Sequence, residues 1–230
     1  MSWREDAKRR AASEAARYVE DGFVVGLGSG STAAYAIREI GRRVREERLR
    51  VLGVPTSYSA FLLAVKSGIP LTTLNEHPTL DLDIDGADQI DSRLNLIKGM
   101  GGALTREKII AASSKKFIVV ADETKLTSSL GENQPIPVEI LPLALPLVID
   151  RIRRIGGRPK LRKRKDGSGP YITDNGNFIL DVDFGVVNEP AKLEMRLKGI
   201  PGVIETGLFL GMAQEAIIGT KDGIKVIRRT

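Results

Sequence analysis

One segment most constrains the fold of this chain: FVVGLGSGSTAAYAIREIGRRV joins an apolar run to a helical pattern through a glycine-rich turn. We expect a buried strand over residues 23–27, a tight loop over 28–31 and a helix over 32–45, capped by Ser31 or Thr32. A strand that passes through a tight turn into a helix is the repeating unit of parallel sheets. The segment therefore favours an α/β fold.

The same alternation continues through the first half of the chain. Helical spacing predicts a helix over residues 6–20, and the following patterns predict strands over 51–54, 71–74, 80–84 and 117–121 and helices over 57–66 and 104–114. Strands and helices that alternate with short loops predict an open, mostly parallel Rossmann-like sheet.

The texture changes after Gly131. The stretch NQPIPVEILPLALP is proline-rich and unsuitable for helix interiors. Beyond it the patterns predict, in order, a helix over 143–155, a strand over 178–182, a helix over 190–197 and a strand over 203–205. A β-α-β-β-α-β order suits a small α+β unit.

Two further apolar runs, 216–219 and 224–227, are expected to return to the first sheet. We therefore predict a main α/β catalytic domain made of residues 1–130 and 206–230. A smaller α+β lid domain, residues 131–205, is expected to be inserted into it, with a cleft between the two.

Composition narrows the chemistry. The 230 residues include 35 Lys and Arg against 29 Asp and Glu, so the net charge of +6 attracts anions. There is no cysteine, which excludes disulfides and thiolate catalysis, and the single histidine lies in the turn sequence NEHP. A low aromatic content of 5% disfavours a base-stacking surface. No signal-peptide pattern or bilayer-spanning run is evident, so we expect a cytoplasmic protein with no membrane partner.

The turn GLGSGSTA is a candidate anion site. Its glycines allow backbone N–H groups to approach an anion, the following helix N-terminus favours negative charge, and Ser29, Ser31 and Thr32 add hydroxyl donors. A plain strand–helix turn is the alternative. A dinucleotide site is weaker, because Ser31 replaces the third glycine of that fingerprint, and no Gly-Lys-Ser/Thr follows as a P-loop requires.

The segment DIDGADQID gathers carboxylates after an apolar pair. Clustered carboxylates suit hard cations, but the spacing does not fit an EF-hand loop. We favour Asp85 and Asp88 as hydrogen-bond acceptors for sugar hydroxyls, and an acidic turn remains an equal alternative on spacing alone.

The segment KGMGGALTREK places Lys98 before a glycine-rich loop and Glu107 in the first turn of the predicted helix. The helix dipole lowers the pKa of a carboxylate at that position, so Glu107 is expected to be ionised and able to act as a base. An ordinary first-turn glutamate is the alternative. Lys125, after the strand at 117–121, is a further ligand candidate because ligands of open α/β sheets lie at the carboxyl ends of strands.

The segment RIRRIGGRPKLRKRK, from Arg151 to Lys165, is strongly basic. A nucleic-acid patch is one interpretation. We favour a solvated face that adds to the attraction of anions.

Taken in order along nearly the whole chain, GLGSGSTAA, DGAD, KGMGGALTREKII, GGRP, TDNGN and IPGV resemble type A ribose-5-phosphate isomerase. The resemblance implies interconversion of ribose 5-phosphate and ribulose 5-phosphate in the non-oxidative pentose phosphate branch, without a metal or cofactor. It also implies a ferredoxin-like second domain and a homodimer or homotetramer, with a phosphosugar rather than nucleic acid as partner.

The same resemblance assigns site residues by motif position. Glu107 falls on the catalytic base, and Asp85, Asp88 and Lys98 fall on polar residues of the active site. The implied substrate-binding residues are Ser29, Gly30, Ser31, Thr32, Gly86, Ala87, Gly99, Met100, Gly101 and Lys125, where Met100 replaces a glycine frequent in the family.

Three other functions fit parts of the pattern. They are another phosphosugar isomerase or deaminating isomerase, a non-catalytic phosphosugar-binding module, and a CoA transferase-like enzyme with a glutamate nucleophile. A binding module would not need an ionised base beside an acidic pair, and a CoA transferase would leave a thioester that hydroxylamine cleaves.

Overall fold

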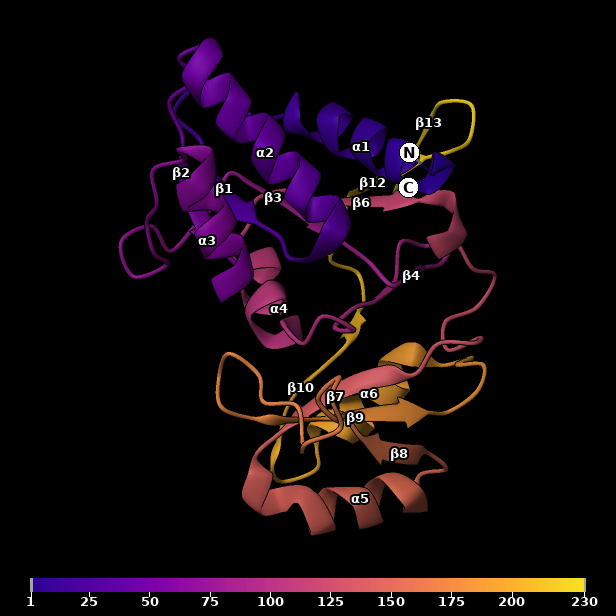
Figure 1. Ribbon diagram of the computed structural model, residues 1–230. Coiled ribbons are helices and arrows are strands. Elements are labelled where there is room, and N and C mark those ends of the chain that lie inside the picture. The colour runs from indigo at the N-terminus through magenta and orange to yellow at the C-terminus, as the bar shows by residue number, and fades with distance from the viewer. Residues whose placement is uncertain (1, 230) are drawn as a thin grey trace. The chain divides into compact units, whose positions relative to one another are not determined.

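The computed structural model describes residues 2–229, which form two compact units (Figure 1). The main unit comprises Met1–Ala87, Arg106–Lys125 and Gly211–Thr230, and the second unit comprises Asp88–Thr105 and Leu126–Leu210. The chain thus crosses between the units four times.

The main unit is built on a six-stranded sheet of order β13-β12-β6-β3-β1-β2. All neighbouring pairs are parallel except β12 with β13. The strands are β1 (Val24–Leu27), β2 (Leu52–Pro55), β3 (Leu82–Gly86), β6 (Phe117–Asp122), β12 (Glu215–Gly219) and β13 (Ile224–Arg228). Strands β1, β6 and β12 are buried along their whole length, as expected for a parallel sheet covered on both faces. The expected Rossmann-like sheet, including the return of the C-terminal strands, is confirmed.

Helices cover both faces of this sheet (Figure 1). The helices of the main unit are α1 (Trp3–Ala16), α2 (Gly30–Glu46), α3 (Tyr58–Ser67) and α4 (Leu104–Ala112), the last beginning in the second unit. Val25 and Leu27 point to a core shared with α1, α2 and α3, whereas Val24 points to a smaller core shared with Ile110 of α4. Alternating strand side chains therefore separate α4 from the other three helices.

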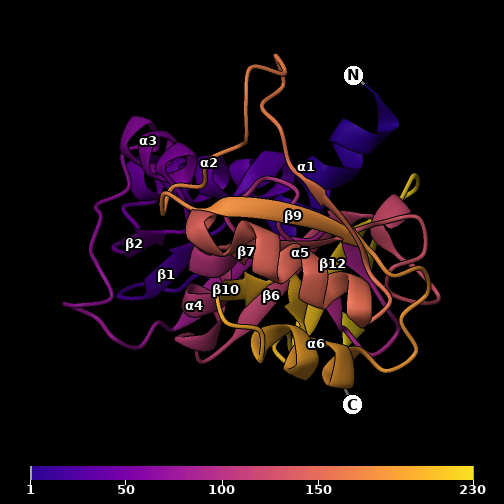
Figure 2. The same cartoon turned by 90° about the horizontal axis from the view of Figure 1, so that it is seen from below.

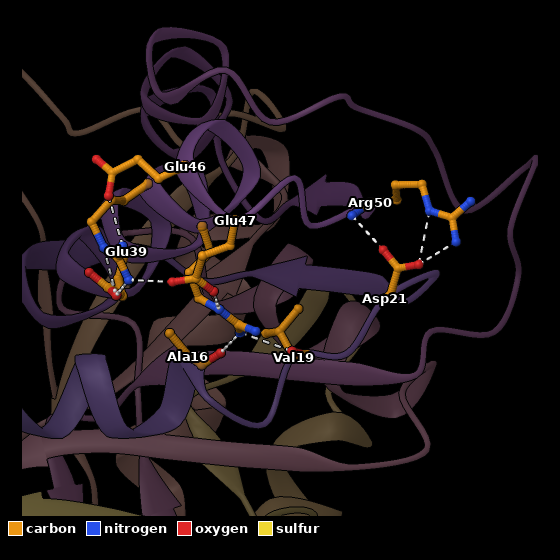
Figure 3. Close-up of polar contacts among 9 residues, drawn as sticks. Ala16, Val19, Asp21, Glu39, Glu46, Glu47 and Arg50 are labelled. Carbon is orange, nitrogen blue, oxygen red and sulfur yellow. Dashed lines mark hydrogen bonds and ion pairs between the residues drawn. The ribbon is translucent and has the colours of Figure 1, made fainter.

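An arginine near the end of α2 ties this helix to the end of α1 (Figure 3). Arg43 donates through Nη1 to the carbonyls of Ala16 and Val19, at 2.5 and 2.9 Å. Its neighbour Arg42 instead lies among Glu39, Glu46 and Glu47, and these carboxylates raise its pKa. Arg43 thus ties α2 to the last carbonyl of α1 and to the turn that follows it.

The second unit contains a four-stranded antiparallel sheet of order β10-β7-β9-β8. Its elements run in the order β7 (Ile136–Ile140), η2 (Pro142–Ala144), α5 (Leu145–Arg154), β8 (Arg158–Leu161), β9 (Phe178–Asp183), α6 (Pro190–Lys198) and β10 (Val203–Thr206). Val148 and Ile152 of α5 and Leu197 of α6 share a core with the sheet, and Figure 2 shows both helices on it. The expected β-α-β-β-α-β order and ferredoxin-like arrangement are confirmed.

Strand β7 lies inside the proline-rich stretch that we described as unsuitable for helix interiors, and for which we predicted no strand bounds. Ile136, Val138 and Ile140 alternate into the core of the second unit, and β7 pairs with β9 and β10 although Pro137 has no N–H group. The proline carbonyl still accepts a hydrogen bond from Gly207 N–H, at 2.7 Å. The many prolines of this stretch obscured a central strand in the sequence, although only one of them, Pro137, lies within the strand.

The second unit also holds a three-stranded sheet of two-residue strands: β4 (Gln89–Ile90), β5 (Leu96–Ile97) and β11 (Leu208–Phe209). Pairing of β5 with β11 explains why residues 88–105 pack with this unit, although our predicted main domain included them. The predicted domain bounds at 130 and 206 stay a prediction.

The strand expected over residues 71–74 is wrong. Leu71 makes a single bridge to Gly53, and the chain then turns, with the N–H groups of Glu76 and His77 both donating to Thr73 O. Between residues 2 and 229, no helix has the length and apolar character needed to cross a membrane.

Candidate active site

The glycine-rich turn of the main unit lies between β1 and α2. Helix α2 begins at Gly30 with Ser29 as its N-cap, so the expected cap at Ser31 or Thr32 is wrong. Ser29 makes no side-chain cap; its Oγ lies 2.7 Å from Thr56 Oγ1 and 2.6 Å from Ser57 Oγ. The hydroxyl of Ser29 is therefore held by the end of the neighbouring strand β2.

Asp85 lies against this turn. Its side chain is fully buried, and Oδ1 accepts hydrogen bonds from the N–H groups of Ser29, at 2.9 Å, and Gly86, at 2.7 Å. A Cβ atom at position 28 would overlap the Asp85 carboxylate, so only glycine fits there. The structure thus brings Asp85, Gly86 and the turn together, as ends of the adjacent parallel strands β1 and β3.

Sequence reasoning missed Thr56 and Ser57. Thr56 is buried and donates to Leu27 O at 3.0 Å, and Ser57 caps α3 by accepting from Ala60 N–H at 3.1 Å. The available signal was positional: two hydroxyl residues directly follow β2, whose carboxyl end lies beside that of β1.

A pocket of about 250 Å³ opens beside the turn. Its lining combines small polar and apolar residues: Gly28, Ser29, Gly30, Ser31, Ala34, Ile37, Ser59, Ala60 and Leu63. Gly30 and Ser31 are exposed and Thr32 is half-buried, so the start of α2 is accessible beside this pocket. That arrangement suits a small anionic group.

Glu107 lies in the first turn of α4, as expected, and its side chain is 5% exposed. The helix begins at Leu104, and the hydroxyl of Thr105 donates to Glu139 Oε2 at 2.5 Å. Burial of an ionisable group is costly unless the group is stabilised or used, so a buried carboxylate at a helix N-terminus is a candidate for chemistry.

Lys98 follows β5 in the second unit and is only 2% exposed. Its N–H group donates to Gly207 O at 2.8 Å, and its Nζ lies 5.4 Å from the centre of the Phe209 ring. The short ladder between β5 and β11 and the aromatic ring together fix the course of this side chain.

Asp88 holds the loop that follows Lys98. It is half-buried, and its Oδ2 accepts from Met100 N–H at 3.0 Å. Positive φ angles occur at Gly99, +106°, and Gly102, +82°, but not at Met100. A side chain at position 100 is therefore compatible with the loop, and the structure brings Asp88 together with Gly99, Met100 and Gly101.

Glu139 of β7 is a buried acceptor for several side chains of the second unit, and it was not predicted from the sequence. Its carboxylate is fully buried and accepts from Thr173 Oγ1 (2.8 Å), Asn175 Nδ2 (3.0 Å) and Asn177 Nδ2 (2.9 Å), besides Thr105. The motif TDNGN thus supplies three donors to one carboxylate. No sequence signal links Glu139 to donors some 34 to 38 residues away.

Lys125 is the lysine that the sequence predicts as a further ligand. Lys125 ends the 3₁₀ turn η1 (Glu123–Lys125), which directly follows β6, and is half-buried. Ala87 follows Gly86 at the end of β3 and is half-buried.

The predicted site residues fall into two sets. The main unit carries Ser29, Gly30, Ser31, Thr32, Asp85, Gly86, Ala87, Glu107 and Lys125, and the second unit carries Asp88, Lys98, Gly99, Met100 and Gly101. Within residues 2–229, no group of three or more His, Cys, Asp or Glu side chains is arranged to hold a metal ion.

Comparison with known proteins gives consistent matches. The family profile described as ribose 5-phosphate isomerase A (phosphoriboisomerase A) matches residues 52–223. The chain is 55% identical over 223 residues to ribose-5-phosphate isomerase A of Methanosarcina acetivorans, covering 96% of this chain and 94% of the relative.

Solved structures agree. Ribose 5-phosphate isomerase A from Methanocaldococcus jannaschii superposes with a TM-score of 0.94 at 46% identity, covering 97% of this chain and 99% of that one. A D-ribose-5-phosphate isomerase in complex with phospho-erythronic acid superposes with a TM-score of 0.96 at 43% identity, over the full length of both chains.

Proposed function

Because the chain belongs to the ribose 5-phosphate isomerase A family, we infer that it interconverts D-ribose 5-phosphate and D-ribulose 5-phosphate as an aldose–ketose isomerase. One observation carries the assignment of residues: Lys98 and Glu107, nine positions apart in KGMGGALTREK, are both almost fully buried. A buried ammonium and a buried carboxylate within one motif are costly for folding alone.

We assign the proton transfer to Glu107. Isomerisation moves a proton between C2 and C1 through an enediolate, and one carboxylate on one face of the sugar can take the proton and return it. The position of Glu107 in the first turn of α4 suits this role, because a helix N-terminus stabilises the ionised form.

We assign stabilisation of the enediolate oxygen to Lys98 and the N–H groups of the loop after it. Fixed donors stabilise a developing oxyanion best when they need not reorganise, and Lys98 is fixed by the β5–β11 ladder and Phe209. The furanose ring must open first, and either Asp85 or Asp88 is proposed to accept those hydroxyl protons, directly or through water.

We propose that the phosphate binds at the start of α2, where Ser29, Gly30, Ser31 and Thr32 present donors, with Lys125 as a further ligand. The relative solved with phospho-erythronic acid supports a phosphorylated sugar acid as a ligand of this fold. The remaining loop residues, Gly86, Ala87 and Gly99–Gly101, are proposed to contact the sugar through their backbones.

The test is an assay of the purified protein with ribose 5-phosphate in the presence of EDTA. We expect ribulose 5-phosphate to form at an undiminished rate, because the proposed chemistry uses carboxylates and an ammonium. Loss of turnover on chelation that a divalent ion restores would contradict the metal-independent mechanism. Absence of turnover both with and without EDTA would contradict the proposed function itself.

We further propose that the protein acts in the non-oxidative branch of the pentose phosphate pathway, in the cytoplasm, as a homodimer or homotetramer. An exposed apolar stripe on α3 supports self-association. Tyr58, Phe61, Leu62 and Val65 recur at helical spacing and are 43–66% exposed, while Ala60 and Ala64 face the core.

A second copy is the occupant that this stripe fits, since two identical helix faces can pair across a two-fold axis. The ten-residue helix can supply only part of the area of about 1,000 Å² that a stable interface needs. We expect light scattering to show an oligomer for the wild type and a smaller mass for Leu62→Glu. A monomeric wild type, or an unchanged mass in the variant, would contradict the assignment of this surface.

A further inference from the structure

The loop that follows Lys98 is held by hydrogen bonds from other segments of the second unit. Gly99 and Gly102 both have positive φ angles, and Gly102 N–H donates to Gly99 O at 3.0 Å to close a tight turn. Glycine has the largest conformational freedom of all residues, so such a turn needs external contacts to hold a single conformation. On the N-terminal side of the loop, Lys98 N–H donates to the carbonyl of Gly207, the residue before β11.

Arg162 supplies contacts on the other side. Its Nη1 donates to Gly99 O at 2.8 Å and to Met100 O at 3.1 Å. Its Nε donates to Asp181 Oδ2 at 2.9 Å, and its Nη2 donates to Asp181 Oδ1. The two side chains are 11% and 20% exposed, so this guanidinium is an enclosed bridge between β9 and the loop.

Tyr171 holds the end of the same turn. Its hydroxyl donates to Gly101 O at 3.2 Å, and a side chain at Gly102 would collide with its ring. Burial raises the pKa of Tyr171, which keeps the hydroxyl protonated as a donor. The carbonyls of residues 99, 100 and 101 thus accept hydrogen bonds from two side chains, Arg162 and Tyr171, of the segment between β8 and β9.

Resting on the proposed function, we propose that Arg162, oriented by Asp181, and Tyr171 are positioning residues that fix the loop of residues 98–102 and thereby aim the Lys98 ammonium and the loop N–H groups at the developing oxyanion. Nothing in this role requires Arg162 to touch the substrate. It also accounts for one arginine of the basic segment 151–165 that does not belong to a solvated face.

The geometry requires arginine rather than any cation. Arg162 uses one edge of its planar guanidinium for a two-point contact with Asp181 and the remaining nitrogen for two carbonyls. A lysine has the same charge but a single ammonium, which cannot keep both contacts in one fixed geometry. A role in attracting the phosphate by charge would survive this substitution, and a positioning role would not.

The experiment compares Arg162→Lys with Arg158→Lys. Arg158 is a matched control, because it lies on β8 and pairs with Asp183 of β9 at 2.7 Å but contacts no loop carbonyl. We expect Arg162→Lys to lower kcat about ten- to a hundredfold, since a displacement of about 1 Å costs up to a hundredfold, with KM changed less than about threefold. Arg158→Lys should keep the wild-type kcat. Tyr171→Phe should lower kcat in the same direction by a smaller factor.

Hydrogen exchange reads the loop itself, independently of turnover. The N–H groups of Met100 and Gly102 should exchange faster in Arg162→Lys, while the amides of β9 and the unfolding temperature stay near those of the wild type. A wild-type kcat in Arg162→Lys, an unchanged exchange rate in the loop, or an equal loss in Arg158→Lys would overturn the proposal. If the wild type itself fails to turn over ribose 5-phosphate, the proposed function fails; if it turns over and Arg162→Lys matches it, only the positioning role fails.

Discussion

At the scale of single residues, the motif KGMGGALTREK carries two buried charged side chains, Lys98 and Glu107. Glu107 and Lys98 were predicted from the sequence, because a glutamate in a first helical turn and a lysine before a glycine loop are local patterns. Glu139, Arg162 and Tyr171 could not be predicted in that way. Their partners lie 19 to 70 residues away along the chain, and the pairing of β7, β8 and β9 brings them together.

Glu139→Gln tests the buried carboxylate. The amide keeps the shape but brings two donors into a site where four side-chain donors converge, so several hydrogen bonds are lost. We expect the free energy of unfolding to fall by roughly 2 kcal/mol or more, the usual worth of hydrogen bonds to a charged group. Urea unfolding measures this, with Glu189→Gln, an exposed partner of Lys192, as the control. Equal stability of the two variants would show that the Glu139 cluster contributes little.

At the scale of elements, the ends of the parallel strands organise the main unit. Asp81 directly precedes β3. Its Oδ2 accepts a hydrogen bond from Val24 N–H at 2.9 Å, and its Oδ1 accepts one from Lys115 Nζ at 2.7 Å. At the opposite, carboxyl edge, Asp85, Ser29 and Thr56 interlock the ends of β1, β2 and β3.

The Asp81 contact predicts a pH dependence of stability. The hydrogen bond from Lys115 holds the pKa of this carboxyl below its usual value. Because the folded-state pKa is lower than the unfolded one, of about 4, the stabilisation is present above that pH and is lost as the pH falls through the folded-state value. Asp81→Asn should therefore be less stable than the wild type at neutral pH, and the difference should shrink below about pH 4. A constant difference across that range in chemical unfolding would exclude this source.

Ser31→Asp tests the start of α2 as the phosphate site. A negative charge in the first turn of a helix is favourable for the helix by about 0.3–1 kcal/mol, so folding should not suffer. The same charge repels a phosphate, so KM for ribose 5-phosphate should rise sharply, whereas the neutral Ser31→Asn should stay near the wild type. If the aspartate variant keeps the wild-type KM and loses only stability, the turn is structural and the phosphate binds elsewhere.

The elements also show where sequence patterns stop being informative. Uniformly apolar runs such as those of β1 and β6 were predicted to within one residue. Strand β7 was given no bounds because the prolines at 135 and 137 outweighed the alternation of Ile136, Val138 and Ile140. Two-residue strands such as β4 and β5 contain too few positions for a period to be recognised.

At the scale of the whole molecule, the fold class followed from the order of elements rather than from any one of them. Alternating strands and helices specified the parallel sheet, and the second unit has the expected β-α-β-β-α-β order although no bounds were predicted for β7 or β8. The assignment of residues 88–105 to the second unit could not be predicted, because it depends on pairing with β11, which lies about a hundred residues later. The resulting chain carries its proposed base in one unit and its proposed oxyanion cation in the other, on a single continuous motif.

The most direct test of this account is the fate of the substrate C2 proton in Glu107→Gln. The amide keeps the size of the side chain and removes its basicity, so kcat should fall by about a hundred- to ten-thousandfold, the usual worth of general-base catalysis. Substrate should still bind, because the amide can hydrogen-bond the sugar. Exchange of the C2 proton with D₂O, followed by NMR, should be abolished in the variant and rapid in the wild type. Near-normal exchange in Glu107→Gln would contradict the account and identify another group, Asp85 or Asp88, as the base.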